Sequence, residues 1–288
     1  MKRILVPTDF SDCSYYAAEV AAQIAKKTGA RVFLLHALEV PQYSSNEPYP
    51  TMSNTAEGIF MMKLVKKEYE KLISQPFFDG VNVAEVVQWE NVYDTITKQS
   101  KEHEIDLIVM GSHGAKGAKE FFVGSNAEKI VRTASCPVIT VKKRLEHFAP
   151  KELVYASSFY GETVEAFTEM KTLIDLFKPR IHLLKVITPA NFESTDHSEK
   201  LMKTFIEHHN LENYTMNVYN EVSVERGIHE FANSRNADLL AMETHGRRGL
   251  AHFFRQSLAE DVVNHTELPL ITMKIPEEEQ SRGAIFPD

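Results

Sequence analysis

The sequence predicts two tandem α/β domains, each an open, parallel, five-stranded β-sheet with helices on both faces. Short apolar runs alternate with amphipathic segments through both halves of the chain. The length of 288 residues corresponds to about two domains of typical size. Residues 105–142 also align without a gap with residues 237–274, and 16 of these 38 positions are identical. Chance would give roughly two identities, so the chain is a duplication.

The residue pattern of the first half predicts five strands and four helices in strict alternation. The strands are expected at Arg3–Val6, Val32–Leu38, Val81–Val87, Ile105–Met110 and Pro137–Val141. The helices are expected at Ser14–Lys27, Ile59–Ile73, Val92–His103 and Ser125–Thr133. The run at 105–110 is continuously apolar, which is typical of a strand buried on both faces. This order predicts a parallel sheet with right-handed crossovers.

The second half repeats this order, with strands near 152–156, 181–187, 215–219, 238–242 and 269–274. The two halves align with an offset of 149 residues at their amino ends. Further along the chain, where residues 105–142 align with 237–274, the offset is only 132 residues. The first half therefore carries an extra segment, which we place at 41–58 because its composition is typical of a loop. We expect domains at 1–145 and 150–276, followed by a flexible acidic tail at 277–288.

Composition excludes several classes of protein. The formal net charge of −8 argues against a nucleic-acid-binding protein, which normally presents a basic face. No apolar run approaches the ~20 residues that span a bilayer, so we expect no membrane partner. The two cysteines, Cys13 and Cys136, cannot form a disulfide framework. A reducing, cytoplasmic location is the expectation.

A ligand site is expected at the carboxyl ends of the strands, where the strand order reverses. Pro7, Thr8 and Asp9 follow the first strand, and the fourth strand is followed by the pattern Gly111-x2-Gly114-x9-Gly124-Ser125. Glycines let backbone amides approach phosphate oxygens because no Cβ intervenes. Gly124-Ser125 also begins a helix, whose amino end favours an anion. The pattern predicts a phosphate-bearing ligand.

The second copy of this pattern keeps its spacing but loses its chemistry. Glu243 replaces Gly111, Gln256 replaces Gly124, and Ser158 replaces Asp9. We therefore expect no nucleotide in the second half. Positively charged residues near this loop leave the binding of another anion open; they are Arg247, Arg248 and Arg255.

These motifs resemble those of the universal stress proteins. Members that bind ATP carry Gly-x2-Gly-x9-Gly-Ser/Thr, which stands letter for letter at Gly111–Ser125. The segments Ile4–Ser11 and Asp106–Gly114 are similar to the family as well, and the resemblance covers essentially the whole chain. It implies a fold like that of the adenine nucleotide alpha hydrolases, with strand order 3-2-1-4-5. It also implies a stress-response regulator that binds ATP or AMP, with or without Mg²⁺.

The resemblance further implies roles for single residues. Asp9 would accept a hydrogen bond from the adenine amino group, and the backbone of Ala37 would frame the adenine. The glycine-rich loop would hold the ribose and the phosphates. The predicted nucleotide-binding residues are Pro7, Thr8, Asp9, Ala37, Met110, Gly111, Ser112, His113, Gly114, Gly124, Ser125 and Asn126.

Enzyme motifs are absent from the sequence. It contains no Gly-x4-Gly-Lys-Ser/Thr loop, no nucleophile elbow and no spacing of zinc ligands. We therefore expect a regulatory binding protein with no catalytic residue and no metal ligand of its own. Two alternatives stay open: a protein that binds a partner without any nucleotide, and a slow ATP hydrolase in the first domain.

The closing strands of the two halves, Val138–Lys142 and Leu270–Lys274, are candidates for sheet edges. In the resembling family such strands pair across a dimer axis, which implies a pseudo-dimer of the two halves within one chain. The second domain is then a structural partner for the first. Association of two chains and an unidentified protein partner are further expectations.

Overall fold

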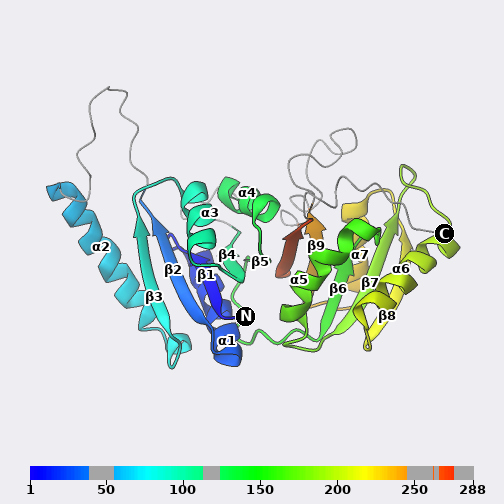
Figure 1. Ribbon diagram of the computed structural model, residues 1–288, viewed down its shortest axis with the longest axis horizontal. Helices are drawn as coiled ribbons and strands as arrows, with labels where there is room; N and C mark the ends of the chain where they lie inside the picture. Colours follow the sequence, from blue (N-terminus) through cyan, green and yellow to red (C-terminus); the bar gives the residue numbers. More distant parts are fainter. Residues whose placement is uncertain (39–54, 113–123, 245–261, 263–265, 276–288) are drawn as a thin grey trace, which may run out of the picture. The chain divides into compact units, whose positions relative to one another are not determined.

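The computed structural model describes residues 1–38, 55–112, 124–244, 262 and 266–275 (Figure 1). The chain forms two compact units. The first comprises residues 1–117 and 143–148, and the second comprises residues 118–142 and 149–288. The expected loop at 41–58 falls largely on residues outside the described ranges, and so does the expected tail at 277–288.

The first unit contains four parallel strands in the order β3-β2-β1-β4. The strands are β1 (Arg3–Pro7), β2 (Arg31–Ala37), β3 (Val83–Gln88) and β4 (Leu107–Gly111). The helices are α1 (Asp12–Thr28), α2 (Ala56–Ile73), the short 3-10 helix η2 (Pro76–Phe78) and α3 (Val92–Glu102). Because the strand order reverses at β1, right-handed crossovers place α3 on the face opposite α1 and α2.

Local signals in the sequence explain where these helices begin and end. The side chains of Ser11, Thr55 and Asn91 accept hydrogen bonds from the first turns of α1, α2 and α3. Gly29 ends α1 in the left-handed region, with φ of 71°, a conformation that glycine adopts without steric cost. The face of α1 that packs on the sheet is rich in alanine, which lets the helix lie close to β1 and β4.

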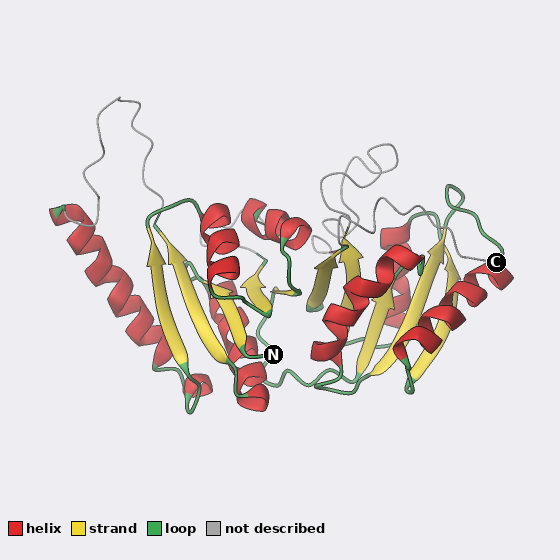
Figure 2. Ribbon diagram, in the orientation of Figure 1, coloured by secondary structure: helices red, strands yellow, loops and turns green. Residues whose placement is uncertain are grey.

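The second unit contains six strands in the order β5-β10-β9-β6-β7-β8. They are β5 (Val138–Val141), β6 (Glu152–Ala156), β7 (Arg180–Ile187), β8 (Tyr214–Asn220), β9 (Leu239–Thr244) and β10 (Leu270–Lys274). The helices are α4 (Ser125–Thr133), η3 (Gly161–Thr163), α5 (Val164–Ile174), α6 (Thr195–His209) and α7 (Val224–Ser234). The five strands of the second repeat are parallel, and their order β8-β7-β6-β9-β10 is the expected 3-2-1-4-5. Figure 2 shows helices packed along them.

The final helix and strand of the first repeat, α4 and β5, belong to this second unit. β5 pairs antiparallel with β10, with Ile139 opposite Ile271. The hydroxyl of Thr244 at the end of β9 donates to the carbonyl of Val131 in α4, at 3.2 Å. The closing strands of the two repeats therefore pair with each other. The predicted domains at 1–145 and 150–276 follow the repeat, whereas the compact units divide it before α4.

The segment that follows β5 returns to the first unit and packs along α1. Arg144 donates two hydrogen bonds to the carboxylate of Glu19, at 2.9 and 3.2 Å. The side-chain amide of Gln23 donates to the carbonyl of Leu145 and accepts from the backbone N–H of Phe148, at 2.9 and 2.6 Å. Polar side chains of α1 thereby fix the course of the chain between the repeats.

The α/β fold with mostly parallel strands confirms the predicted fold class. The predicted strands and helices all occur, and their ends shift by a few residues at most; α4 matches at both ends. The 3-10 helix η2 was not predicted because a three-residue turn leaves no periodic pattern. Among the described residues, no helix combines the length and the apolar character that crossing a bilayer requires.

Candidate functional site

Three of the four strands in the first unit end with residues of the predicted site. Pro7 ends β1, Ala37 ends β2 and Gly111 ends β4. Because these parallel strands are neighbours, their carboxyl ends lie along one edge of the sheet. The structure thus brings together Pro7, Thr8, Asp9, Ala37, Met110, Gly111 and Ser112 at that edge.

The turn after β1 is fixed by the hydroxyl of Thr8. Thr8 is buried, its backbone N–H donates to the carbonyl of Leu35 at 2.8 Å, and its hydroxyl lies 3.0 Å from that of Ser14. The same hydroxyl accepts from the N–H of Phe10, at 3.1 Å. Phe10 has a φ of 61°, a left-handed conformation that a bulky residue adopts only when its surroundings impose it. The turn therefore holds the neighbouring residue Asp9 in a defined position.

Asp9 lies between these fixed residues and is exposed. One oxygen of its carboxylate accepts from the backbone N–H and the hydroxyl of Ser11, at 3.1 and 2.5 Å. Ser11 in turn caps α1. The carboxylate is thus oriented from the helix cap while its side chain stays accessible to a ligand, as hydrogen bonding to an amino group requires.

Aromatic rings pack beside the carboxyl end of β2. Nδ1 of His36 donates to the carbonyl of Thr8 at 2.8 Å, and the ring of Phe10 lies tilted against that of His36, with their centres 4.8 Å apart. Phe10 also meets Tyr69 edge to face at 5.3 Å. The hydroxyl of Tyr69 lies within hydrogen-bond distance of the carbonyls of Leu34 in β2 and Val86 in β3. Burial raises the pKa of this hydroxyl far above its ordinary value. Phe10, His36 and Tyr69 thus pack against one another beside the turn after β1.

Gly111 is required by close packing. A Cβ at this position would lie 2.9 Å from the backbone carbonyl carbon of Cys13 and 3.0 Å from its Cβ. Real Cβ atoms do not approach backbone atoms so closely, so any side chain here pushes the first turn of α1 away from β4. The next residue, Ser112, is fully buried. The glycine therefore lets α1 pack against the carboxyl end of β4.

The other predicted residues lie outside the described residues or belong to the second unit. His113 and Gly114 lie outside the described residues. Gly124 precedes the first residue of α4 and provides no side-chain cap, while Ser125 is exposed at the helix start and Asn126 is half-buried. These three belong to the second unit. The amino end of α4 retains the backbone N–H groups that favour an anion.

The second repeat reproduces the backbone of this edge. Ser157 takes the place of Thr8: its N–H donates to Leu184 at 3.1 Å, and its hydroxyl accepts from the N–H of Phe159 at 2.9 Å. Phe159 has a φ of 60°, like Phe10. It meets Phe205 edge to face at 5.2 Å, as Phe10 meets Tyr69. The turn and its aromatic wall are thus conserved between the repeats.

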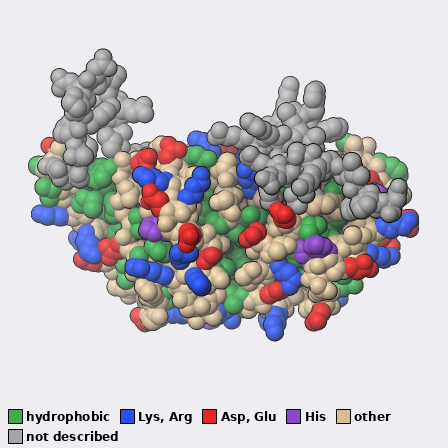
Figure 3. All heavy atoms as spheres, in the orientation of Figure 1, with side chains coloured by type: hydrophobic (Ala, Val, Ile, Leu, Met, Phe, Trp, Pro, Cys, Tyr) green, Lys and Arg blue, Asp and Glu red, His purple; other side chains and the backbone are tan. Residues whose placement is uncertain are grey.

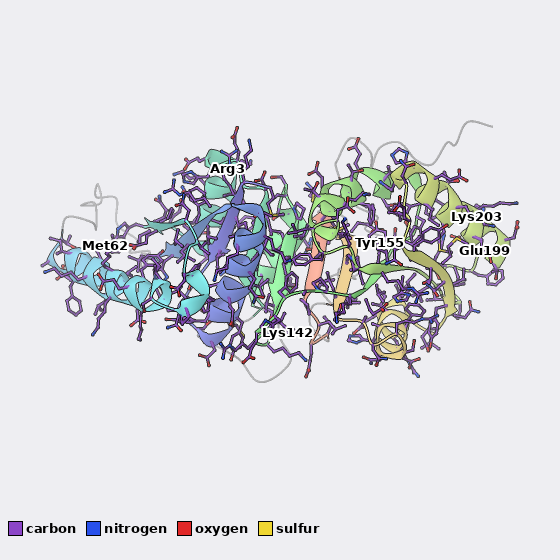
Figure 4. The ribbon with its side chains drawn as sticks, turned by 90° about the horizontal axis from the view of Figure 1, so that it is seen from below. Arg3, Met62, Lys142, Tyr155, Glu199 and Lys203 are labelled. Carbon is purple, nitrogen blue, oxygen red and sulfur yellow. The ribbon has the colours of Figure 1, made fainter. Side chains whose placement is uncertain are left out.

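The side chains above this conserved turn are different. Glu243, at the position of Gly111, is buried, and its carboxylate accepts from the hydroxyl of Ser157 at 2.7 Å. Tyr155 lies fully buried beneath it among the strands of the second unit (Figure 4). Burial and the nearby Glu243 raise the pKa of Tyr155 well above its ordinary value. A charged side chain thus fills the place where the first repeat has bare backbone.

A second charged group stands where the first repeat has His36. Lys185 is buried at the end of β7, and its ammonium lies 2.6 Å from the carboxylate of Glu193 and 4.7 Å from the ring centre of Tyr160. The hydroxyl of Tyr160 donates to Glu193 at 2.6 Å. Burial alone would raise the pKa of Glu193, but the hydrogen bonds from Lys185 and Tyr160 and the charge of Lys185 lower it.

Sequence reasoning missed this ion pair. The available signal was a lysine inside the apolar strand 181–187, at the position aligned with His36. Its partner Glu193 carries no signal because it lies in a connecting segment after β7. The predicted substitutions of Asp9 and Gly111 by Ser158 and Glu243 lie where expected, whereas Gln256 and the nearby arginines fall outside the described residues.

Comparison with known proteins agrees with this geometry. The model of the universal stress protein family matches residues 1–142 and 161–274. A universal stress protein from Methanocaldococcus jannaschii is 33% identical over 150 residues, which are 49% of this chain and 82% of that protein. The universal stress protein YxiE from Bacillus subtilis is 29% identical over 154 residues, 49% of this chain and 98% of that protein.

Both repeats together are similar to a solved structure. The crystal structure of a universal stress protein from Archaeoglobus fulgidus superposes with a TM-score of 0.70 at 17% identity, and the match covers 96% of this chain and 97% of that one. At this identity the match supports the fold alone. With a family match over both repeats, the chain belongs to the universal stress protein family.

Proposed function

We propose that the first repeat binds one adenine nucleotide, ATP or AMP, as a regulatory ligand, and that the second repeat serves as its structural partner. One observation carries this proposal. The same carboxyl edge is built twice on the same backbone, and only the first copy keeps bare backbone at Gly111, whereas the second fills the position with the buried side chain of Glu243.

The residues of the first copy fit the groups of an adenine nucleotide. The exposed carboxylate of Asp9 is oriented to accept from an exocyclic amino group. Gly111 has no side chain at the carboxyl end of β4, where its missing Cβ lets the first turn of α1 lie against the strand, and we propose that its backbone contacts the ribose or the phosphates. The helix that begins at Ser125 has an amino end without a side-chain cap, which suits a phosphate. When bound, the nucleotide supplies a negative charge and a flat base, and Mg²⁺ neutralises part of that charge.

The second repeat fits the role of a partner better than that of a second binding site. Lys185 is ion-paired with Glu193 at 2.6 Å, and Glu243 accepts from the hydroxyl of Ser157 at 2.7 Å. A phosphate at this position would meet a buried carboxylate, which is strongly unfavourable at short range. This supports one nucleotide per chain and no nucleotide in the second repeat.

Isothermal titration calorimetry with ATP and with AMP, each with and without Mg²⁺, tests the proposal. We expect one site per chain. Asp9→Ala and Gly124→Gln should each weaken binding by at least about tenfold, because one loses a directional acceptor and the other crowds the helix start. Ser158→Ala, at the position that matches Asp9, is the control and should bind like the wild type. Two equal sites, or no binding at all, would refute the proposal.

A slow hydrolase and a protein without any nucleotide are the remaining functions to distinguish. Release of phosphate from ATP that requires Mg²⁺, and that stops in Asp9→Ala, would establish a hydrolase. Native mass spectrometry of the purified chain separates the other case, because a nucleotide-binding protein is expected to retain added ATP as a discrete mass shift. Absence of that shift together with a flat calorimetric titration would leave partner binding as the function.

A further inference from the structure

Two side chains fix the peptide groups on either side of Asp9. Nδ1 of His36 donates to the carbonyl of Thr8 at 2.8 Å, and this carbonyl belongs to the peptide group that links Thr8 to Asp9. The hydroxyl of Thr8 accepts from the N–H of Phe10 at 3.1 Å, and this N–H belongs to the peptide group that links Asp9 to Phe10. Because both peptide groups are planar and held, the Cα of Asp9 has little freedom to move.

The ring of His36 is itself held in place. The backbone N–H of Thr8 donates to the carbonyl of Leu35 at 2.8 Å, which places Thr8 beside His36 where β1 and β2 end. The ring of Phe10 packs against that of His36, with centres 4.8 Å apart, and against that of Tyr69 at 5.3 Å. The imidazole therefore has a defined orientation, which a directional hydrogen bond requires.

The second repeat keeps one of the two bonds beside its own turn. The hydroxyl of Ser157, at the position of Thr8, accepts from the N–H of Phe159 at 2.9 Å. Phe159 has a φ of 60° and Phe10 has a φ of 61°. This bond is thus present in both repeats, whether or not an aspartate follows, and it serves the shape of the turn.

The side chain at the position of His36 differs between the repeats. Lys185 stands there in the second repeat, and its ammonium lies 2.6 Å from the carboxylate of Glu193. The residue at the position of Asp9 in the same repeat is Ser158. The histidine thus occurs in the repeat that has the aspartate, and both are replaced in the other. This joint difference indicates that His36 serves Asp9 rather than the shape of the turn.

We infer that His36 is a positioning residue for nucleotide binding, which acts through the carbonyl of Thr8 on Asp9. The inference rests on the function proposed above for the first repeat. With the imidazole in place, the Thr8–Asp9 peptide group is held and the carboxylate of Asp9 is presented to the amino group of the base. Without it this peptide group can rotate, and binding then has to order it at a cost in affinity.

Placement of single groups matters because the chain offers a nucleotide little general attraction. The formal net charge is −8, and Figure 3 shows acidic and basic side chains interspersed over the face in view. An anionic ligand gains no long-range attraction from a net negative charge. Its affinity depends on directional contacts that are in place before it binds.

Calorimetric titration with ATP of two variants at position 36 tests the inference. His36→Leu and His36→Asn both remove the ring, but the side-chain amide of asparagine still donates to the carbonyl of Thr8. His36→Leu should weaken ATP binding by about tenfold, and His36→Asn should recover most of that loss. Binding like the wild type in His36→Leu, or equal losses in the two variants, overturns the inference.

The matched control is His103→Leu, which removes another half-buried histidine of the first unit. The ring of His103 stacks on that of Phe33 in β2, with centres 4.7 Å apart. His103 follows α3 shortly before β4 begins, at the amino edge of the sheet. This control should bind ATP like the wild type. Circular dichroism checks that each variant is folded.

A double-mutant cycle with Asp9→Ala separates positioning from a direct or purely structural role. If His36 acts through Asp9, His36→Leu should cause no further loss of affinity in a chain that already carries Asp9→Ala. A residue that contacted the nucleotide itself, or that only stabilised the domain, would add its own loss in both backgrounds. Additive losses therefore overturn the inference.

Amide hydrogen exchange followed by NMR tests the positioning without any nucleotide. The N–H of Phe10 should exchange at least about tenfold faster in His36→Leu than in the wild type, because the peptide groups beside Asp9 are then less restrained. His36→Asn should restore slow exchange. A wild-type chain that binds no ATP refutes the proposed function, whereas the exchange rates still decide the role of His36. Unchanged exchange at Phe10 in His36→Leu overturns that role.

Discussion

The two repeats agree at the amino edges of their sheets and differ at the carboxyl edges. At the amino edge, the carboxylate of Asp106 accepts from the backbone N–H groups of Lys2 and Arg3, and that of Asp238 accepts from Lys151 and Glu152. At the carboxyl edge, Gly111, which has no side chain, contrasts with the buried Glu243. The difference teaches that the two repeats share the contacts that define the fold and differ at the edge where we propose that the first repeat binds its ligand.

The agreement at the amino edge extends to individual backbone bonds. The N–H of Asp106 donates to Arg3 and that of Asp238 to Glu152, both at 3.0 Å. Arg31 donates to Lys2, and Arg180 to Lys151, at 2.8 and 2.7 Å. These bonds connect the start of the central strand to its neighbours. Their loss would cost both repeats alike, so they persist whether or not a ligand binds.

Placing the side chain of the second repeat in the first should have the largest effect. Gly111→Glu forces a Cβ against the backbone of Cys13 and adds a negative charge where phosphate is proposed to bind. We expect ATP affinity to fall by more than about a hundredfold, equivalent to roughly 3 kcal/mol, in calorimetric titration. Gly111→Ala separates the causes, because it retains the steric conflict without the charge. Binding equal to the wild type in Gly111→Glu would break the comparison.

Breaking the ion pair that is unique to the second repeat should destabilise that repeat alone. Glu193→Ala leaves the ammonium of Lys185 buried without its carboxylate, which costs about 3 kcal/mol. The single tryptophan, Trp89, lies in the first unit. Urea unfolding should therefore shift when followed by circular dichroism and stay nearly unchanged when followed by tryptophan fluorescence. Lys185→Met with Glu193→Leu is the control and should be much less destabilised.

The same pair gives the second repeat a dependence on pH. The folded pKa of Glu193 lies below its ordinary value of 4.5. Its contribution is therefore complete above that value and is lost as pH falls through the lower, folded pKa. The difference in unfolding free energy between the wild type and Glu193→Gln should shrink below about pH 4.5. A constant difference from pH 7 to pH 3 would contradict this ion pair.

Removing the equivalent aspartates at the amino edges of the two sheets should have moderate and similar effects in the two repeats. Asp106→Ala and Asp238→Ala each remove a carboxylate that accepts from two backbone N–H groups. We expect a loss of about 1–2 kcal/mol in each case, because the bonds are charge-assisted and partly exposed. Tryptophan fluorescence should report the first variant, and circular dichroism the second. A large loss of unfolding free energy in only one repeat would show that the two aspartates are not equivalent.

The smallest effect is expected from restoring a single ligand residue to the second repeat. Ser158→Asp recreates the position of Asp9 but leaves Glu243 and the Lys185–Glu193 pair in place. Calorimetry should still find one ATP per chain. A second ATP site in this variant would show that the missing carboxylate at position 158, and not the side chain of Glu243, prevents ATP binding by the second repeat.

Sequence reasoning recovered the fold well because its signals are local or periodic. The apolar run before Gly111, the amphipathic spacing of the helices, and the alignment of residues 105–142 with 237–274 each act through neighbouring residues or through the repeat. The position of β5 beside β10 was expected only from resemblance to a family. The pairing of Lys185 with Glu193 was missed because it depends on where a connecting segment folds.

The antiparallel pairing of β5 with β10 also bears on how the duplicated gene has been retained. A fused pair that joins its own closing strands has no free strand edge at that place, whereas loss of the second repeat would expose β5 and invite aggregation. The second repeat thus covers β5, whatever ligand either repeat binds.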